Sequence, residues 1–225
     1  LITGGTRGMG LEIAKWMGKR GAGNLVLVSR RGLSEGPQSS LSNDKNEALA
    51  SCVKELEGQG VTVHVLAIDL SLPEAQKTLQ QAIDGLQLPP VKGVVHAAGV
   101  AGYHTLDRCS PSDLDNTMAP KALGALALDS IFPPGSLDFF LLTSSVGQLV
   151  GFPGQLTYAP ANAFLDGFAV YRRRQGDACT SIQWTCWRGV GLMAQNKSAI
   201  RMILRGMQAR GIADISPEEA LAALE

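Results

Sequence analysis

Short apolar runs alternate with longer amphipathic stretches along the whole chain. The apolar runs are rich in β-branched residues and nearly uniform in hydrophobicity, which is typical of strands buried on both faces. Such runs occur at Leu25–Ser29, Val61–Ile68, Val91–His96, Leu137–Thr143 and Thr180–Trp184. Helical periodicity predicts helices over residues 9–20, 44–58, 74–86, 111–130, 158–175 and 193–209. This alternation predicts an α/β fold with a doubly wound parallel sheet and helices on both faces.

The length and composition fit one domain. The chain has 225 residues, of which 45% are hydrophobic, enough to bury one large core. Leu1 and Ile2 form only a stub before a glycine turn, and a helix start with Ser216 as N-cap and Glu219 in a capping box lies close to the other end. We therefore expect a single domain over residues 1–225 that is a fragment of a larger multidomain chain. Flexible ends missing from the sequence are the alternative explanation.

Charge and cysteine content narrow the choice of partners and compartment. Lysine plus arginine and aspartate plus glutamate number 20 each, so no bulk charge favours nucleic acid or an anionic membrane. No apolar stretch reaches the roughly 18 residues needed to cross a bilayer, and a signal-peptide pattern is lacking at the start. The spacing of Cys52, Cys109, Cys179 and Cys186 indicates reduced thiols. We expect a cytoplasmic location and a small-molecule or protein partner.

A glycine-rich segment, Thr3–Gly10, separates the first strand stub from the first helix. Glycine permits a tight turn and a close approach of backbone to a pyrophosphate, and the helix N-terminus offers unpaired N–H groups to the anion. In a βαβ setting this pattern predicts a Rossmann-type dinucleotide site, with a merely structural turn as the alternative. The residues expected to contact the cofactor here are Gly4, Thr6, Arg7, Gly8, Met9 and Gly10.

The end of the second predicted strand indicates which dinucleotide binds. An NAD site usually has an acidic residue at this position to bind the ribose hydroxyls, but this chain has Ser29 followed by Arg30. A hydroxyl beside a guanidinium matches the needs of a 2′-phosphate, so we predict NADPH. Two ordinary surface arginines, Arg30 and Arg31, are the alternative.

Two further strand ends complete the predicted cofactor site. Asp69 and Leu70 end the third strand, where the carboxylate is placed either to accept from the adenine amino group or to serve as an ordinary loop aspartate. Ala97, Ala98 and Gly99 end the fourth strand, and their small size leaves room for the ribose and nicotinamide. We expect the preceding His96 to pack within the sheet.

Four polar residues form a candidate catalytic group. Ser145 ends the fifth strand, Tyr158 starts a helix, and Asn162 lies one turn further on the same helix face. Lys121 lies in the helix before the fifth strand. Each residue type is common in such places, but their joint spacing downstream of the glycine turn predicts one site.

These residues resemble those of a known family. The segments Thr3–Gly10, Ser29–Gly32 and His96–Gly99, with the four polar residues, resemble the ketoreductase domains of polyketide synthases and animal-type fatty-acid synthases, which are short-chain dehydrogenases/reductases. Most members of that superfamily carry a lysine four residues after the tyrosine, whereas this chain has Asn162 there and Lys121 in place of the usual asparagine. The segments Gly151–Gln155, Tyr158–Asp166 and Trp184–Gly189 extend the likeness, and the last is similar to fungal partially reducing synthases of the 6-methylsalicylic acid type.

The resemblance implies a reaction, a cofactor and partners. NADPH would reduce a β-ketoacyl thioester carried on the phosphopantetheine arm of an acyl carrier protein, beside other domains of the same synthase and without a metal. Tyr158 would donate a proton to the ketone oxygen, Lys121 would make the phenol more acidic, and Ser145 would hydrogen-bond the oxygen. Asn162 would hold the lysine or a water. A stand-alone reductase of small ketones and an inactive dinucleotide-binding module remain the alternatives.

The substrate end carries weaker signals. Ala101–Tyr103 and Val150 stand where the family's stereochemical fingerprints would be, so the configuration of the alcohol is not predicted. The segment Val190–Arg210 carries several apolar residues at roughly helical spacing, for which the resemblance implies a mobile lid and ordinary core is the alternative. These residues are Met193, Ile200, Met202, Ile203, Leu204 and Met207.

Overall fold

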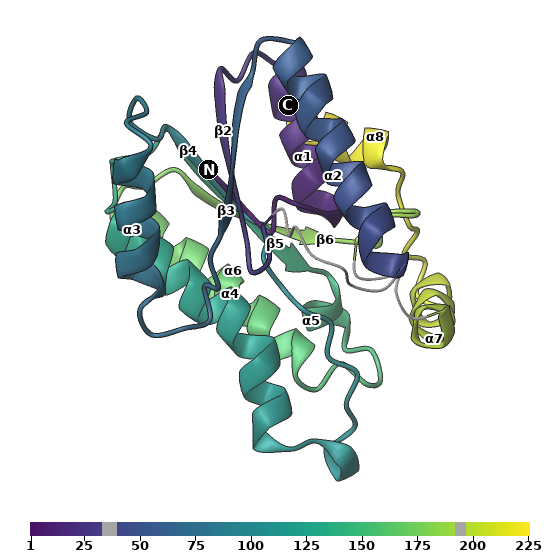
Figure 1. Cartoon of the computed structure of the whole chain (residues 1–225). Coiled ribbons are helices and arrows are strands. Elements are labelled where there is room, and N and C mark those ends of the chain that lie inside the picture. Colours follow the sequence, from purple (N-terminus) through teal and green to yellow (C-terminus); the bar gives the residue numbers. More distant parts are fainter. Residues whose placement is uncertain (33–39, 192–196) are drawn as a thin grey trace.

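A computed structural model describes residues 1–32, 40–191 and 197–225. Its centre is a six-stranded sheet in the order β3-β2-β1-β4-β5-β6, and every pairing is parallel (Figure 1). The doubly wound parallel sheet predicted from the sequence is therefore confirmed. Its strands are β1 (Ile2–Thr3), β2 (Asn24–Ser29), β3 (Thr62–Ala67), β4 (Gly93–His96), β5 (Phe139–Ser145) and β6 (Cys179–Trp184). The direction of winding reverses between β1 and β4, and ligands of open α/β sheets bind at such a switch point.

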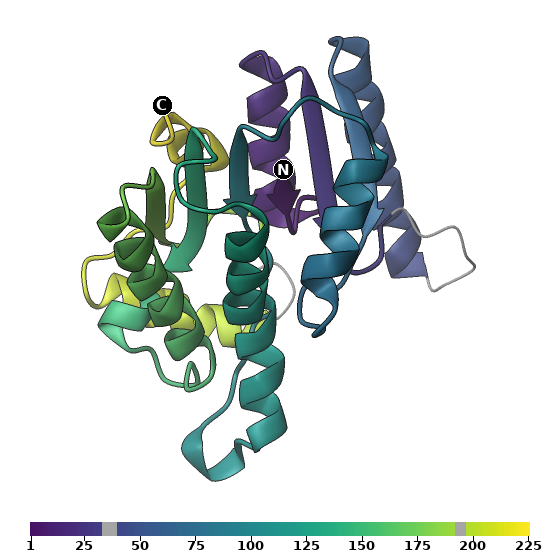
Figure 2. The ribbon, with the colours of Figure 1, turned by 90° about the vertical axis from the view of Figure 1, so that its left-hand side faces the viewer.

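Helices cover both faces of the sheet (Figures 1 and 2). One face carries α1 (Gly8–Lys19), α2 (Ser40–Gly58) and α8 (Pro217–Ala222). The other face carries α3 (Ala75–Gly85), α4 (Pro111–Ile131) and α6 (Tyr158–Arg174). The shorter elements α5 (Gly147–Val150) and a 3-10 turn (Leu106–Arg108), and the helix α7 (Lys197–Gln208), lie in the connections near the carboxyl ends of the strands.

Each face has its own apolar core, which explains the uniform apolar runs of the central strands. On one face Ile13 of α1 packs in a buried cluster with Leu27 of β2. On the other, Leu128 of α4 and Leu165 of α6 share a buried cluster with Phe140 of β5. A central strand thus has apolar neighbours above and below, as expected for a parallel sheet.

The edge strands differ from the prediction that every strand is buried on both faces. In β3, Thr62 and Ala67 are exposed and the residues between them are only half-buried, because an edge strand has a neighbour on one side alone. The predicted run also extended from Val61 to Ile68, and both of these residues are buried although they lie outside β3. At this edge, the ends of the apolar run therefore indicate which residues are buried, and they do not mark where the paired strand begins and ends.

The predicted helix start that has a clear capping signal is confirmed. The start of the helix predicted from residue 193, which has no such signal, is not described. Ser216 Oγ accepts from Glu219 N–H at 3.2 Å and Glu219 Oε2 accepts from Ser216 N–H at 2.6 Å, so the predicted capping box forms. The helix predicted over residues 193–209 is described as α7 from Lys197, and residues 193–196 lie outside the described residues. The element α5 and the 3-10 turn were not predicted, because they are too short to show a period.

All four cysteines are free thiols, as expected, and Cys52 and Cys179 are buried. Within the described ranges, the structure has no helix that is both long and apolar enough to cross a membrane.

A buried guanidinium connects α6 to the end of α4. Arg172 of α6 is fully buried and donates to the carboxylates of Asp129 and Asp177 and, at 2.9 Å, to the carbonyl of Phe132. Its guanidinium also lies 4.8 Å from the centre of the Phe140 ring. The Asp177 side chain is 1% exposed, so this ion pair lies in the interior.

We therefore expect Arg172→Met to lower the free energy of unfolding by about 3–5 kcal/mol, because it leaves a buried carboxylate unpaired. Urea unfolding of the purified domain measures this change. The exposed neighbour Arg174→Met is the control, and should change stability by less than about 0.5 kcal/mol. Recovery of stability in Arg172→Met/Asp177→Asn would confirm the cause, whereas an unchanged Arg172→Met would contradict it.

Candidate active site

A cleft of about 740 Å³ opens at the switch point between β1 and β4. The glycine turn and the carboxyl ends of β2, β3 and β4 line it, together with Lys121 and Tyr158. Every predicted cofactor residue except Gly10 lines this cleft: Gly4, Thr6, Arg7, Gly8, Met9, Ser29, Arg30, Asp69, Leu70, Ala97, Ala98 and Gly99. The sequence therefore located the cleft, although the bound ligand itself stays a prediction.

Close backbone packing explains the glycines of the turn. Gly4 has a φ of +65°, and a Cβ there would lie 2.6 Å from the carbonyl oxygen of Ala97. Gly10 is not among the residues that line the cleft, and its predicted cofactor contact stays a prediction. A Cβ at Gly10 would lie 2.4 Å from the carbonyl oxygen of Gly4, so its lack of a side chain lets α1 approach β1.

The N-terminus of α1 points its unpaired N–H groups at the cleft. Gly8 and Met9, the first residues of α1, line the cleft, and the first turn contains no acidic side chain. The N-cap residue Arg7 makes no side-chain cap, so these N–H groups remain available to an anion.

Three arginines gather near the end of β2. The pKa of Arg7 is lowered by partial burial and then by the positive charges of Arg30 and Arg31, which places the three guanidinium groups within electrostatic reach of one another. Ser29 Oγ accepts from Gly32 N–H at 3.1 Å and shapes the turn between them. An anion here would relieve the mutual repulsion, so this end of the cleft fits a phosphate group.

The other two strand ends have distinct roles. Asp69 Oδ1 accepts from the N–H and the hydroxyl of Ser71, at 2.9 and 2.6 Å, so one carboxylate oxygen stabilises the turn after β3. A Cβ at Gly99 would lie 3.0 Å from Lys121 Cε, so the small residue makes room for the lysine side chain.

His96 packs within the sheet, as expected, and is fully buried. Its Nδ1 lies 2.7 Å from Thr3 Oγ1 and its Nε2 lies 3.0 Å from the carbonyl oxygen of Lys121. Because a carbonyl only accepts, Nε2 carries the proton and Nδ1 accepts from the threonine hydroxyl. Burial, assisted by the nearby Lys121 ammonium, lowers the pKa of His96 to about 4. The neutral ring thus joins the start of the glycine turn to the helix turn that carries Lys121.

The structure places the other three predicted catalytic residues around Tyr158: Lys121 lines the same cleft, Ser145 lines the adjoining cavity, and Asn162 is hydrogen-bonded to the Tyr158 backbone. Lys121 is 3% exposed, its Nζ donates to the carbonyl of Thr143 at 2.7 Å, and Nζ lies 5.9 Å from the centre of the Tyr158 ring. Ser145 Oγ accepts from Gly147 N–H at 3.2 Å. Asn162 Nδ2 donates to the carbonyl of Tyr158 at 2.8 Å, and its buried Oδ1 has no partner within the described part of the chain.

Burial dominates the titration of this group. It raises the pKa of Tyr158 to about 12, and hydrogen bonding to Asn162 and Ser145 offsets this only in part. It lowers the pKa of Lys121 to about 8 against the opposing charge of Asp166. Burial therefore outweighs the hydrogen bonds in setting the phenol pKa, and the expected role of Lys121 in making the phenol more acidic stays a prediction.

A smaller cavity of about 80 Å³ adjoins the cleft at Tyr158. Ile203 and Met207 of α7 line it and share a small buried cluster with Phe152, which fits both the lid and the ordinary core predicted for Val190–Arg210. Met202 is exposed, and Met193 and the side chain of Ile200 lie outside the described residues. Other members of the wall, not predicted as site residues, are Tyr103, Phe152, Gln155, Trp184, Cys186 and Trp187.

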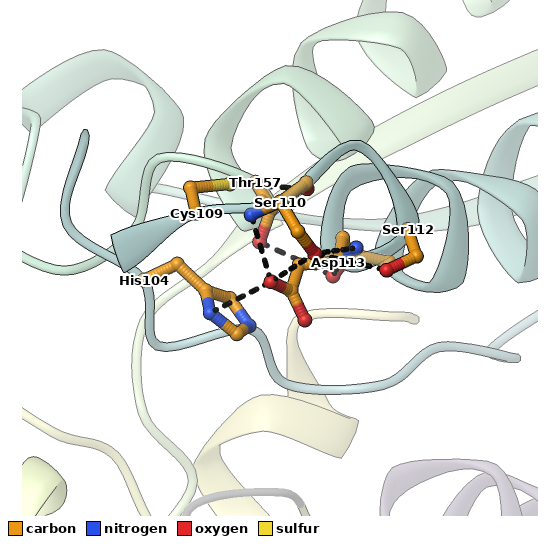
Figure 3. Close-up of polar contacts among 7 residues, drawn as sticks. His104, Cys109, Ser110, Ser112, Asp113 and Thr157 are labelled. Carbon is orange, nitrogen blue, oxygen red and sulfur yellow. Dashed lines mark hydrogen bonds and ion pairs between the residues drawn. The ribbon is translucent and has the colours of Figure 1, made fainter. Parts of the chain in front are cut away.

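The segment that carries Tyr103 contacts the loop before Tyr158. Figure 3 shows the neighbouring polar contacts, in which His104 faces Asp113 and Thr157 lies close to Ser110. His104 N–H donates to the carbonyl of Gly154 at 2.8 Å, and the His104 ring faces Asp113 at 3.7 Å. The hydroxyls of Thr117 and Thr157 also hydrogen-bond at 3.1 Å. No sequence spacing marks these contacts, which explains why the wall was missed.

The sheet order, the glycine turn and the serine, tyrosine and lysine define a short-chain dehydrogenase/reductase. More specifically, the chain belongs to the KR domain family, whose model matches residues 1–189, and it is a ketoreductase, an oxidoreductase of the polyketide synthase type. Members of this family are dinucleotide-binding reductases.

Relatives and solved structures support this assignment. The chain is 48% identical to a 6-methylsalicylic acid synthase of Aspergillus niger and 40% identical to a mellein synthase of Phaeosphaeria nodorum, over 99% and 100% of its length. It spans 12% of each of these relatives. A solved A1-type ketoreductase matches 99% of this chain and 43% of its own length, with a TM-score of 0.83 at 33% identity. The first ketoreductase of the tylosin synthase matches with a TM-score of 0.82 at 32% identity, over 99% of this chain and 44% of its own.

The lowered pKa of His96 predicts a loss of stability in acid. The unfolded chain binds a proton near pH 6.5 and the folded chain near pH 4, so stability falls as the pH drops through this window. The full loss amounts to about 3 kcal/mol. Urea unfolding at a series of pH values should show this loss in the parent and a flatter dependence in His96→Gln. Parallel curves for the two proteins would contradict the assignment.

Proposed function

We propose that this chain reduces a β-ketoacyl thioester to the β-hydroxyacyl thioester with NADPH. The observation that carries the proposal is the position of Tyr158, which lines both the large cleft and the small cavity. A phenol at that junction lies between a nucleotide in the cleft and an acyl chain in the cavity.

The residues of the cleft fit NADPH. The glycine turn and the N-terminus of α1 would hold the pyrophosphate, and Arg30 with Arg7 and Ser29 would hold the 2′-phosphate. Asp69 would accept from the adenine amino group, and Ala97–Gly99 would leave space for the ribose and nicotinamide. When bound, NADPH supplies a hydride to the carbonyl carbon.

The chain's own residues would place the ketone and deliver the proton. Because Ser145 Oγ accepts from Gly147 N–H, its own proton is available to the ketone oxygen. Tyr158, with a pKa of about 12, is protonated at neutral pH and would donate to the developing alkoxide. Lys121, with a pKa of about 8, would remain largely cationic at neutral pH and would favour the phenolate that is left. Asn162 Oδ1 would accept from a water that returns the proton.

The substrate would arrive on the phosphopantetheine arm of an acyl carrier protein, and the chain would act as one catalytic domain of a larger synthase. Curated relatives, of which this chain spans 12%, support the second statement. An inactive module finds no support, since the glycine turn and Tyr158 are both present. A stand-alone reductase is less well supported, since the relatives are much longer synthases. The cytoplasmic location stays a prediction.

Tyr158→Phe should slow NADPH oxidation, followed at 340 nm with a simple ketone such as a decalone, by about 100-fold or more, because general acid catalysis is lost. NADPH binding should persist, since the phenol is needed for proton transfer. Tyr171→Phe, at a half-exposed position of the same helix, is the matched control and should retain the parent rate. Equal rates for Tyr158→Phe and the parent would show that Tyr158 is not the acid.

Arg30→Ala should weaken NADPH binding about 10- to 100-fold, because it removes a charge-assisted hydrogen bond to a phosphate. NADH lacks that phosphate, so its dissociation constant should change by less than about 3-fold. Fluorescence titration with both nucleotides measures the two constants, with the exposed Arg174→Ala as control. Equal losses for NADPH and NADH would exclude a 2′-phosphate contact.

A further inference from the structure

We propose that Arg201 and Arg205 of α7 bind the phosphodiester at the base of the phosphopantetheine arm, and so form the surface on which a loaded carrier protein docks. This inference rests on the proposed function, because the arm is part of the proposed substrate. It adds where on the molecule the arm enters and which side chains recognise its charge.

The two faces of α7 have opposite characters. Ile203 and Met207 are buried and line the small cavity beside Tyr158. Arg201 and Arg205 are exposed and one turn apart, on the side of the helix away from that pair. Figure 2 shows α7, in yellow-green, beyond the carboxyl ends of the strands, where the cavity lies. The two arginines therefore stand at the outside of the cavity wall.

Both guanidinium groups lack an anionic partner among the described residues, whereas neighbouring arginines have one or are otherwise engaged. Arg188 pairs with Asp214 and Glu219, and Arg210 lies 5.5 Å from the centre of the Phe152 ring. The chain as a whole carries 20 basic and 20 acidic residues, but the segment 178–213 contains no aspartate or glutamate. Its basic residues are Arg188, Lys197, Arg201, Arg205 and Arg210. This segment of the sequence, which includes α7, is thus a local concentration of basic residues in a neutral chain.

The chemistry of the arm matches this arrangement. Its thioester end must reach Tyr158, and its one charged group is the phosphodiester at the other end, next to the carrier. The cavity is walled by apolar and aromatic side chains such as Phe152 and Trp184, where a phosphate would lose its hydration without compensation. The phosphate must therefore stay outside, and two guanidinium groups one turn apart suit its geometry and charge.

The test compares β-ketoacyl pantetheine with β-ketoacyl 4′-phosphopantetheine, two thioesters that differ only in the phosphate, and adds the same acyl group on a carrier protein. The parent should have a higher kcat/KM for the phosphorylated thioester. Arg201→Glu/Arg205→Glu should lower kcat/KM about 3- to 10-fold for the phosphorylated and carrier-bound substrates, from two exposed charge contacts. It should leave the pantetheine thioester unchanged, which also shows that the variant is folded. Added salt should reduce the difference, because exposed charges are screened.

Lys77→Glu/Arg174→Glu is the matched control, since it makes the same charge change at exposed positions of α3 and α6 and should behave as the parent. Arg201→Gln/Arg205→Gln should give a smaller loss in the same direction. If the parent and the glutamate variant reduce both small thioesters equally well, the phosphate site is wrong while the proposed ketone reduction stands. A loss of activity seen only with the carrier-bound substrate would also overturn the phosphate site, because the arginines would then bind acidic side chains of the carrier and not the phosphate. If the parent reduces none of the three, the proposed function fails and this inference with it.

Discussion

The site depends on how closely the glycine turn approaches the end of β4. A Cβ at Gly4 would overlap the backbone of Ala97, so these two strand ends can meet only because position 4 has no side chain. Gly10 likewise allows a close contact, because a Cβ there would overlap the carbonyl of Gly4 and keep α1 away from the glycine turn. His96 then connects this contact to Lys121 through its two ring nitrogens. The position of Lys121 is therefore set by the same packing that shapes the cleft.

Burial controls the chemistry that this packing allows. The environment that raises the pKa of Tyr158 from 10.0 to about 12 also lowers the pKa of Lys121 from 10.5 to about 8, so the two values move apart. Burial thus favours the neutral form of each group: the phenol holds its proton more firmly than in water, and the ammonium gives up its proton more readily. The Lys121 ammonium donates to the Thr143 carbonyl, so a strand end fixes its position while burial sets its pKa.

The sequence predicted the parts of the molecule that are local or periodic. The parallel sheet followed from apolar runs, the cleft from the glycine turn and strand ends, and the catalytic group from the spacing of Tyr158, Asn162 and Ser145. It did not predict the wall of the small cavity, because Tyr103 and Gln155 come together through a loop contact between His104 and Gly154 that has no periodic signature. The close packing of Gly10 on Gly4 was not predicted for a related reason, since a glycine that packs and one that contacts a ligand look alike in a motif.

Asn162 shows how a helix start can prepare a site for a molecule that arrives later. Its Nδ2 donates to the carbonyl of Tyr158, which identifies the other atom of the amide as oxygen and orients it. That oxygen is buried and has no partner within the described residues, although buried acceptors are nearly always paired. A structural asparagine would satisfy both atoms, whereas one that binds a water or an ammonium during a reaction must keep an acceptor in reserve. Asn162 lies one helical turn after Tyr158, whose proton would be replaced after each reduction under the proposed function, and the unsatisfied oxygen fits that role.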